Sequence, residues 1–164
     1  MVKNKRGFTL VEAVLTVALV SIVFVLGSQI FVQINRFIIL NRTKIELQRE
    51  ARAILPIINS NLRQASVNSL IIDQVSGQPY YSRISFRRVD GTDYTFYQQN
   101  KKLIMTTSGT SQVLSSNLRY LAFAAPRSDD LTIVSVSLTL EKEITELRTK
   151  ALHMASEKVM IMND

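Results

Sequence analysis

Hydrophobic positions follow different patterns along the chain, and the first pattern is a long uncharged run. Residues 13–35 contain no charged side chain and consist mostly of Val, Leu, Ile, Phe and Ala. About 20 helical residues, each rising about 1.5 Å, cross the hydrocarbon core of a bilayer. This run is therefore long enough to span a membrane as a helix.

Near Ile34 the pattern changes, and apolar residues recur at steps of three and four. This spacing predicts an amphipathic helix that continues the apolar one. No Gly or Pro interrupts the chain between Ser28 and Leu55, and Pro56 is expected to kink the helix. We predict one helix over residues 8–66, bent near Pro56. The apolar positions of its second half are Phe37, Ile38, Ile45, Ala51, Ile54, Leu55, Ile58, Leu62 and Ala65.

After Val67 the period changes to two, which is typical of half-buried strands. Asp90-Gly91 is a hairpin turn signal, and residues 100–102 are a second predicted turn. The predicted strands are residues 82–88, 94–98, 103–107, 118–124 and 131–140, and the predicted loops are residues 108–111 and 126–130.

The end of the chain fits two structures. Residues 141–155 contain good helix formers, yet they also fit a continued strand, and both interpretations stay open. Residues 159–162 could form a last short strand.

These elements together predict the fold class. A long amphipathic helix needs a surface on which to bury its apolar stripe, and an antiparallel sheet with one apolar face needs a cover. We therefore predict an α+β fold, in which a long N-terminal helix packs on an antiparallel sheet. Residues 35–164 would form the globular domain, made of the second half of the helix and the sheet.

Basic residues precede the apolar run and bear on whether it is a cleaved signal peptide or a retained membrane helix. Lys3, Lys5 and Arg6 fit the start of a secretory signal peptide. However, the apolar region of such a peptide is only about 7–15 residues long, and here the run is longer. A retained membrane helix fits this pattern better than a cleaved signal. The basic residues predict a cytoplasmic N-terminus and an extracytoplasmic C-terminal domain.

Composition removes several kinds of chemistry. The 164 residues carry a net charge of +7, with no Cys and one His, His153. Disulfides, thiolate catalysis and Cys-based metal sites are therefore excluded, and a zinc site is not expected. Asp129-Asp130 could contribute to a calcium site, but Ca²⁺ needs about 6–8 oxygen ligands. With no Gly-rich phosphate loop and no Gly-x-Ser-x-Gly turn, we expect no enzyme activity, cofactor or metal.

One carboxylate, Glu12, stands at the entrance of the apolar run. A carboxylate at the centre of a membrane helix costs about 2.5–3.5 kcal/mol on insertion scales. Glu12 lies nearer the end, where the cost is smaller. Its side chain could extend to the lipid headgroups, or it could serve a function inside the membrane.

A motif at residues 5–12 bears on that choice. Its sequence, KRGFTLVE, followed by an unbroken apolar helix, resembles the cleavage and methylation signature of type IV pilins and pseudopilins. The resemblance implies that a prepilin peptidase cuts between Gly7 and Phe8 and methylates the new amine of Phe8. Residues 1–7 would be the leader peptide, and residues 8–34 the transmembrane and assembly half of the helix.

The same resemblance implies that Glu12 serves recruitment and register. Its carboxylate would lie beside the Phe8 amine of a neighbouring subunit, which recovers much of the desolvation cost. The implied partners are other pilin or pseudopilin subunits, the prepilin peptidase, an assembly-platform membrane protein and inner-membrane lipid. The chain would be a single-pass inner-membrane protein that becomes part of an extracytoplasmic filament.

Two departures from major pilins favour a minor pilin or minor pseudopilin. Many major pilins have a proline in the membrane half of the helix and a C-terminal disulfide. Here the first proline is Pro56 and no cysteine is present, although Gly27-Ser28 could supply a soft point. The initiating tip subunit of pseudopili often lacks the glutamate, so Glu12 disfavours that role. The segments that loosely resemble larger minor subunits are residues 61–65, 84–86 and 118–123.

Several functional alternatives stay open. The sequence does not distinguish a pilus from a secretion or competence pseudopilus, nor the position of the subunit in the filament. A bitopic membrane protein whose outer domain binds a ligand, without a filament, is the alternative function. Basic residues could also contact DNA, as pili of competence systems do, but we favour protection of a sheet edge. These residues are Arg83, Arg87, Arg88, Lys101 and Lys102.

Overall fold

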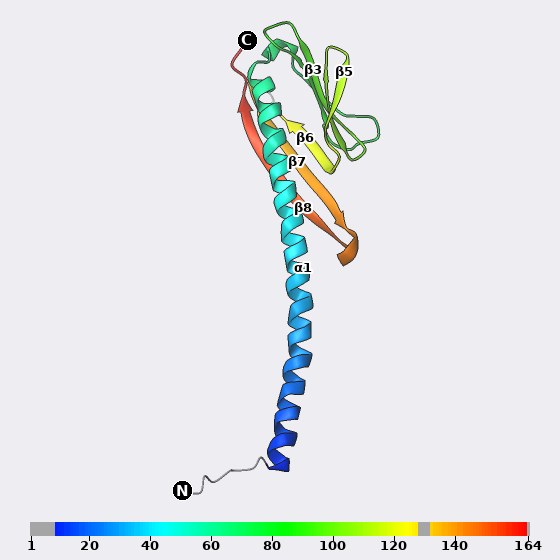
Figure 1. The fold of residues 1–164 in the computed structure, drawn as a ribbon. Coiled ribbons are helices and arrows are strands. Elements are labelled where there is room, and N and C mark those ends of the chain that lie inside the picture. Colours follow the sequence, from blue (N-terminus) through cyan, green and yellow to red (C-terminus); the bar gives the residue numbers. More distant parts are fainter. Residues whose placement is uncertain (1–8, 128–131, 164) are drawn as a thin grey trace. The chain divides into compact units, whose positions relative to one another are not determined.

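A computed structural model describes residues 9–127 and 132–163, except for the side chain of residue 146 (Figure 1). Packing divides the chain into two units, Met1–Asn41 and Arg42–Asp164. One helix, α1 (Leu10–Arg63), runs through the boundary without interruption. The predicted long helix is thus confirmed, and Pro56 lies inside it. Because proline has no N–H, the helical hydrogen bond to the carbonyl of Arg52 is missing.

Two antiparallel sheets follow the helix in the second unit. The prediction of an α+β fold is confirmed, but the strands form two sheets instead of one. A five-stranded sheet has the order β1-β2-β3-β4-β5, and a three-stranded sheet has the order β6-β7-β8. The strands are β1 (Ile71–Asp73), β2 (Arg83–Arg87), β3 (Asp93–Gln99), β4 (Lys102–Thr107), β5 (Thr110–Ser115), β6 (Leu118–Ala124), β7 (Ile133–Ile144) and β8 (Thr149–Met160).

The predicted strands correspond to β2, β3, β4, β6 and β7, whereas β1 and β5 were not predicted. Strand β1 has only three residues, too few to show a period. Strand β5 begins at Thr110, so the loop predicted for residues 108–111 is wrong in its second half. The first four residues of β5 are all exposed, and without alternating burial the sequence carries no strand period.

The tail forms a long hairpin, so the helical interpretation of residues 141–155 is wrong. Strand β7 continues to Ile144 and pairs with β8 along its whole length, from Ile133 opposite Met160 to Ile144 opposite Thr149. Ladder hydrogen bonds override the helix propensity of this segment. Val159 and Met160 are the end of β8, not a separate short strand.

The predicted turn at Asp90-Gly91 is confirmed by its backbone geometry. Gly91 has φ +83°, a conformation that glycine adopts without steric cost. The N–H of Gly91 donates to the carbonyl of Arg88 at 2.9 Å, and the N–H of Thr92 donates to the Asp90 carboxylate at 2.9 Å. The turn brings β2 and β3 into register, with Phe86 opposite Tyr94.

The core of the second unit lies between α1 and the sheets. Figure 1 shows the cyan and green part of α1 running alongside β7 and β8. Phe37, Ile38 and Ile45 were predicted in the apolar stripe, but they are 66%, 41% and 47% exposed. That part of the prediction is wrong because all three side chains stay exposed, so none belongs to the buried stripe. The buried residues of α1 are Leu47, Ala51, Ile54, Leu55, Ile58 and Leu62.

A buried amide, Gln98 on β3, joins the two sheets. Its Nε2 donates to the carbonyl of Arg119 at 2.9 Å, and its Oε1 accepts the N–H of Leu121 at 2.9 Å. Both partners lie on β6. Because a buried polar group must be paired, this side chain fixes how the five-stranded sheet meets the three-stranded one.

Candidate assembly segment

The described part of the chain begins at Thr9, which caps helix α1. Thr9 Oγ1 accepts the N–H of Glu12 at 3.3 Å, and the carbonyl of Thr9 accepts the N–H of Ala13 at 3.1 Å. This bonding satisfies one of the N–H groups that a helix start leaves unpaired. The role of Thr9 was not predicted, although the Thr-x-x-Glu spacing of a capping box indicates it.

Glu12 lies in the first turn of α1 and is exposed. Helix N-termini carry partial positive charge, so a carboxylate is stabilised there. Among the residues that the structure describes, none forms an ion pair with Glu12. The predicted cleavage and methylation residues, Gly7 and Phe8, lie outside the described residues. Thr9 and Glu12 thus form a capped, acidic helix start immediately after the predicted cut.

Exposed apolar side chains fill the first half of α1. Every side chain from Leu10 to Ile38 is exposed, with Leu10 at 81% and Phe24 at 76%. Within the described residues, α1 is the one helix long and apolar enough to cross a membrane. Soluble monomers rarely show an apolar surface of this extent. The segment therefore fits an environment of lipid or of other apolar helices.

Hydroxyl groups in this half are satisfied by the helix itself. In lipid each polar group needs an internal partner, because no water is present. Serine and threonine meet this need by bonding to carbonyls three or four residues earlier. The bonds run from Thr16 to Ala13 at 2.9 Å, from Ser21 to Val17 at 2.7 Å and from Ser28 to Val25 at 2.9 Å.

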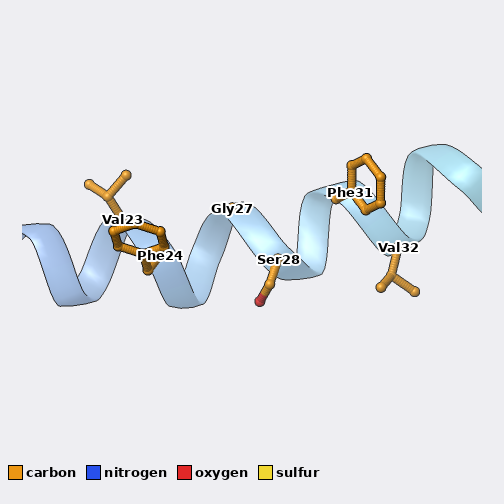
Figure 2. Close-up of a pocket in the computed structure, with 6 residues that line it drawn as sticks. All are labelled: Val23, Phe24, Gly27, Ser28, Phe31 and Val32. Carbon is orange, nitrogen blue, oxygen red and sulfur yellow. The ribbon is translucent and has the colours of Figure 1, made fainter.

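A surface hollow of about 540 Å³ lies at Gly27. Figure 2 shows Gly27 without a side chain between the rings of Phe24 and Phe31. A Cβ added at Gly27 would meet nothing within 4 Å, so the hollow is open. Small residues of this kind let a neighbouring membrane helix approach closely. Helix α1 continues without a break through Gly27-Ser28, the predicted soft point.

Several of the basic residues considered for DNA contact are ion-paired. The Arg83 guanidinium lowers the pKa of Asp73, chiefly through its hydrogen bond to that carboxylate. Arg87 lowers the pKa of Asp93 in the same way. Charges that are already paired are less available to phosphates. The pairs are Arg83–Asp73, Arg87–Asp93 and Arg88–Asp90.

A further charge cluster surrounds Glu141 on β7 and was not predicted. Its carboxylate is 10% exposed and accepts from Arg119 Nη1 at 2.8 Å and from Lys150 Nζ at 2.7 Å. The hydrogen bond from Lys150 is the main reason why the pKa of Glu141 is lowered. Because Arg119 lies on β6 and Lys150 on β8, the cluster connects all three strands of the sheet.

Metal-ligating side chains do not gather in the part of the chain described. There, no three or more His, Asp or Glu residues form a group that could hold a metal ion. His153 is half-buried on β8, and Asp129 and Asp130 lie outside the described residues.

Comparison with known protein families gives a match at the start of the chain. Residues 2–28 match the family model described as the prokaryotic N-terminal methylation motif. This segment includes Gly7, Phe8, the capping Thr9 and Glu12, and it ends beside the hollow at Gly27. No curated protein and no solved structure matches the chain.

Proposed function

We propose that this chain, whose N-terminal methylation motif supports a place in the type IV pilin and pseudopilin family, is a minor subunit of such a filament. The filament would be a type IV pilus or a type II secretion-like pseudopilus, and the subunit would have a structural, non-catalytic role. A prepilin peptidase would cut between Gly7 and Phe8 and methylate the amine of Phe8. One observation carries the proposal: the motif leads into a helix whose side chains are all exposed from Leu10 to Ile38.

Before assembly, the first half of α1 would anchor the subunit in the inner membrane. Lys3, Lys5 and Arg6 favour a cytoplasmic N-terminus, with the two sheets on the extracytoplasmic side. An assembly-platform protein would then move the processed subunit into the filament. There the same apolar surface would pack against helices of other subunits instead of lipid.

The energetics of Glu12 support a partner from another subunit. A carboxylate in a membrane helix costs about 2.5–3.5 kcal/mol at the centre and less toward the end. The partial positive charge of the helix N-terminus stabilises such a carboxylate by typically 0.3–1 kcal/mol, and by about 2 kcal/mol at most. A cation from a neighbour would supply the rest, since a buried charge is tolerated when it is paired. The methylated amine of Phe8 in an adjoining subunit is that cation.

The minor rather than major role rests on two features of the sequence. Helix α1 contains no proline before Pro56, and the chain has no cysteine to close a C-terminal loop. Both features depart from the pattern of many major pilins.

N-terminal mass spectrometry of the membrane-extracted protein tests the proposal. We expect a mature chain that begins at a methylated Phe8. An intact Met1 in a host that has the peptidase would overturn the proposal. That result would favour the bitopic membrane protein, whose outer domain binds a ligand without a filament.

Replacing Glu12 tests the register role. We expect Glu12→Ala to insert into the membrane normally but to enter sheared filaments about tenfold less, a deficit equivalent to about 1.4 kcal/mol. Glu143→Ala, which removes an exposed carboxylate from β7, is the matched control and should assemble normally. Equal incorporation of both variants would contradict the role of Glu12.

A further inference from the structure

Helix α1 carries four arginines on the face opposite its buried stripe. With 3.6 residues per turn, Arg42, Arg49, Arg52 and Arg63 lie roughly 110–170° around the helix from the centre of the buried residues. All four side chains are exposed. We call these four residues the arginine face.

In the described part of the chain the arginine face is not neutralised by ion pairs. None of its four side chains takes part in an ion pair there. The acids on this part of α1 are engaged elsewhere: Glu46 pairs with Lys142 at 2.5 Å, and Glu50 accepts from Asn117 at 2.9 Å. The face extends about 31 Å along the helix, several times the Debye length of about 8 Å at physiological salt. A single small anion could therefore neutralise only part of it.

A second copy of this chain is a poor partner for the arginine face. Two such faces in contact would place like charges together, and this repulsion disfavours the contact. Most described acids of the second unit are already held by partners within the chain. The acids in internal ion pairs are Glu46, Asp73, Asp90, Asp93 and Glu141.

Two surface hollows lie beside the arginine face. A hollow of about 370 Å³ is bordered by Pro56, Ser60 and Arg63, and another of about 400 Å³ by Arg52, Pro56 and Glu157. Both are shallow, so they suit side chains of a protein surface laid along the helix.

We infer that the arginine face docks an acidic surface of a different protein, one that presents Asp or Glu side chains along about 31 Å. Charge complementarity is the reason for this partner, because unpaired guanidinium groups recognise carboxylates by paired hydrogen bonds. Within the proposed function, which this inference rests on, the partner is a different subunit of the same filament. The chain would then occupy a position next to an acidic neighbour and not next to itself.

Cross-linking of the full chain in its native membranes tests the inference. Because the chain has no cysteine, Ser60→Cys gives one attachment point for a thiol-reactive photo-cross-linker. Ser60 is exposed and borders the hollow beside Arg63. Adducts are identified by the mass of the joined peptides, and their yield is measured at about 0.05 and 0.5 M NaCl, which changes the Debye length severalfold.

Two sets of variants decide whether the charges act. In the Ser60→Cys background we expect Arg49→Glu with Arg52→Glu to lower the yield about tenfold or more, and Arg49→Lys with Arg52→Lys to lower it less. Lys102→Glu with Lys158→Glu is the matched control, since both lysines are exposed and the change in net charge is equal. Its yield should stay within about twofold of the parent. The thermal midpoint of each variant is measured to show that the fold is kept.

The expected result is a salt-sensitive adduct with an acidic segment of another protein, lost on charge reversal and restored when that segment's acids are changed to lysine. An adduct with a second copy, an adduct with lipid alone, or a yield that charge reversal does not change would overturn the inference. If the chain starts at methylated Phe8 and enters filaments without such an adduct, the inference fails while the proposed function stands. An unprocessed chain instead refutes the proposed function.

Discussion

The two halves of helix α1 contain the same residue types but use them differently. In the first half Ile22 is 56% exposed, whereas in the second half Ile58 is fully buried. The second half stabilises the fold by covering the sheets. The first half contributes nothing to that core, so its hydrophobicity serves its surroundings: lipid or neighbouring helices.

Polar groups show the same contrast. In the first half, hydroxyls such as those of Thr16 and Ser21 bond back to the helix. In the second half, some side chains bond to other elements: Glu46 accepts from Lys142 on β7, and Glu50 accepts from Asn117. The hydroxyl groups of the first half therefore need no partner outside the helix, whereas polar side chains of the second half bind the sheets.

A matched pair of alanine substitutions tests this contrast most strongly. We expect Ile58→Ala to lower the free energy of unfolding by about 2–5 kcal/mol, because it leaves a cavity in the core. Ile22→Ala should change that free energy by less than about 0.5 kcal/mol, since its side chain touches no core. Denaturant unfolding of the detergent-solubilised chain measures both. Equal effects would mean that the two halves share one core.

A matched pair of lysine substitutions tests the membrane role. Ser21 and Ser60 are both exposed and both donate to a helix carbonyl, of Val17 and Ile57 respectively. We expect Ser21→Lys to weaken membrane insertion by about 2.5–3.5 kcal/mol, because it places a charge in the hydrocarbon core. Ser60→Lys should insert normally. Carbonate extraction of membranes measures the retained fraction, and equal retention would contradict a membrane span in the first half.

Loss of the helix cap should have a smaller and more local effect. Thr9→Val removes the oxygen that accepts the Glu12 N–H. We expect a cost of about 1 kcal/mol, seen as roughly fivefold faster hydrogen exchange of that amide. Thr16→Val, which removes a hydroxyl that only donates to the carbonyl of Ala13, is the control. Unchanged exchange at Glu12 in Thr9→Val would show that the cap does not stabilise the first turn.

The smallest expected effect is a pH dependence in the second unit. Since the pKa of Glu141 in the folded chain lies below its ordinary value of 4.5, its ion pairs stabilise the fold above that pH. The stabilisation is lost as pH falls through the lowered pKa, when the carboxylate takes up a proton. Glu141→Gln should therefore lower the thermal midpoint at pH 7. At a pH below the lowered pKa, where the carboxyl group is protonated, it should change the midpoint little.

Glu143→Gln, an exposed change on the same strand, is the control for this titration. A deficit in Glu141→Gln that is equally large at both pH values would show that packing, not charge, is what the substitution disturbs.

By itself the sequence determined the local features of this protein. The uncharged run and the apolar residues at steps of three and four predicted the continuous helix. Alternating apolar and polar residues predicted most of the strands. Asp90-Gly91 predicted a turn, because a hairpin turn needs a positive φ and glycine adopts it readily, as Gly91 does. The motif around Gly7, Phe8 and Glu12 was recognisable because it is a short contiguous pattern, and the family match covers it.

Only the tertiary structure decided which surfaces meet. It placed the start of the buried stripe at Leu47, divided the strands between two sheets joined by Gln98, and turned the helix-prone tail into β8. It also brought Arg119 and Lys150 to Glu141. Each of these depends on partners far away in the chain, and a residue's own propensity is weaker than the burial and hydrogen bonds that such partners supply.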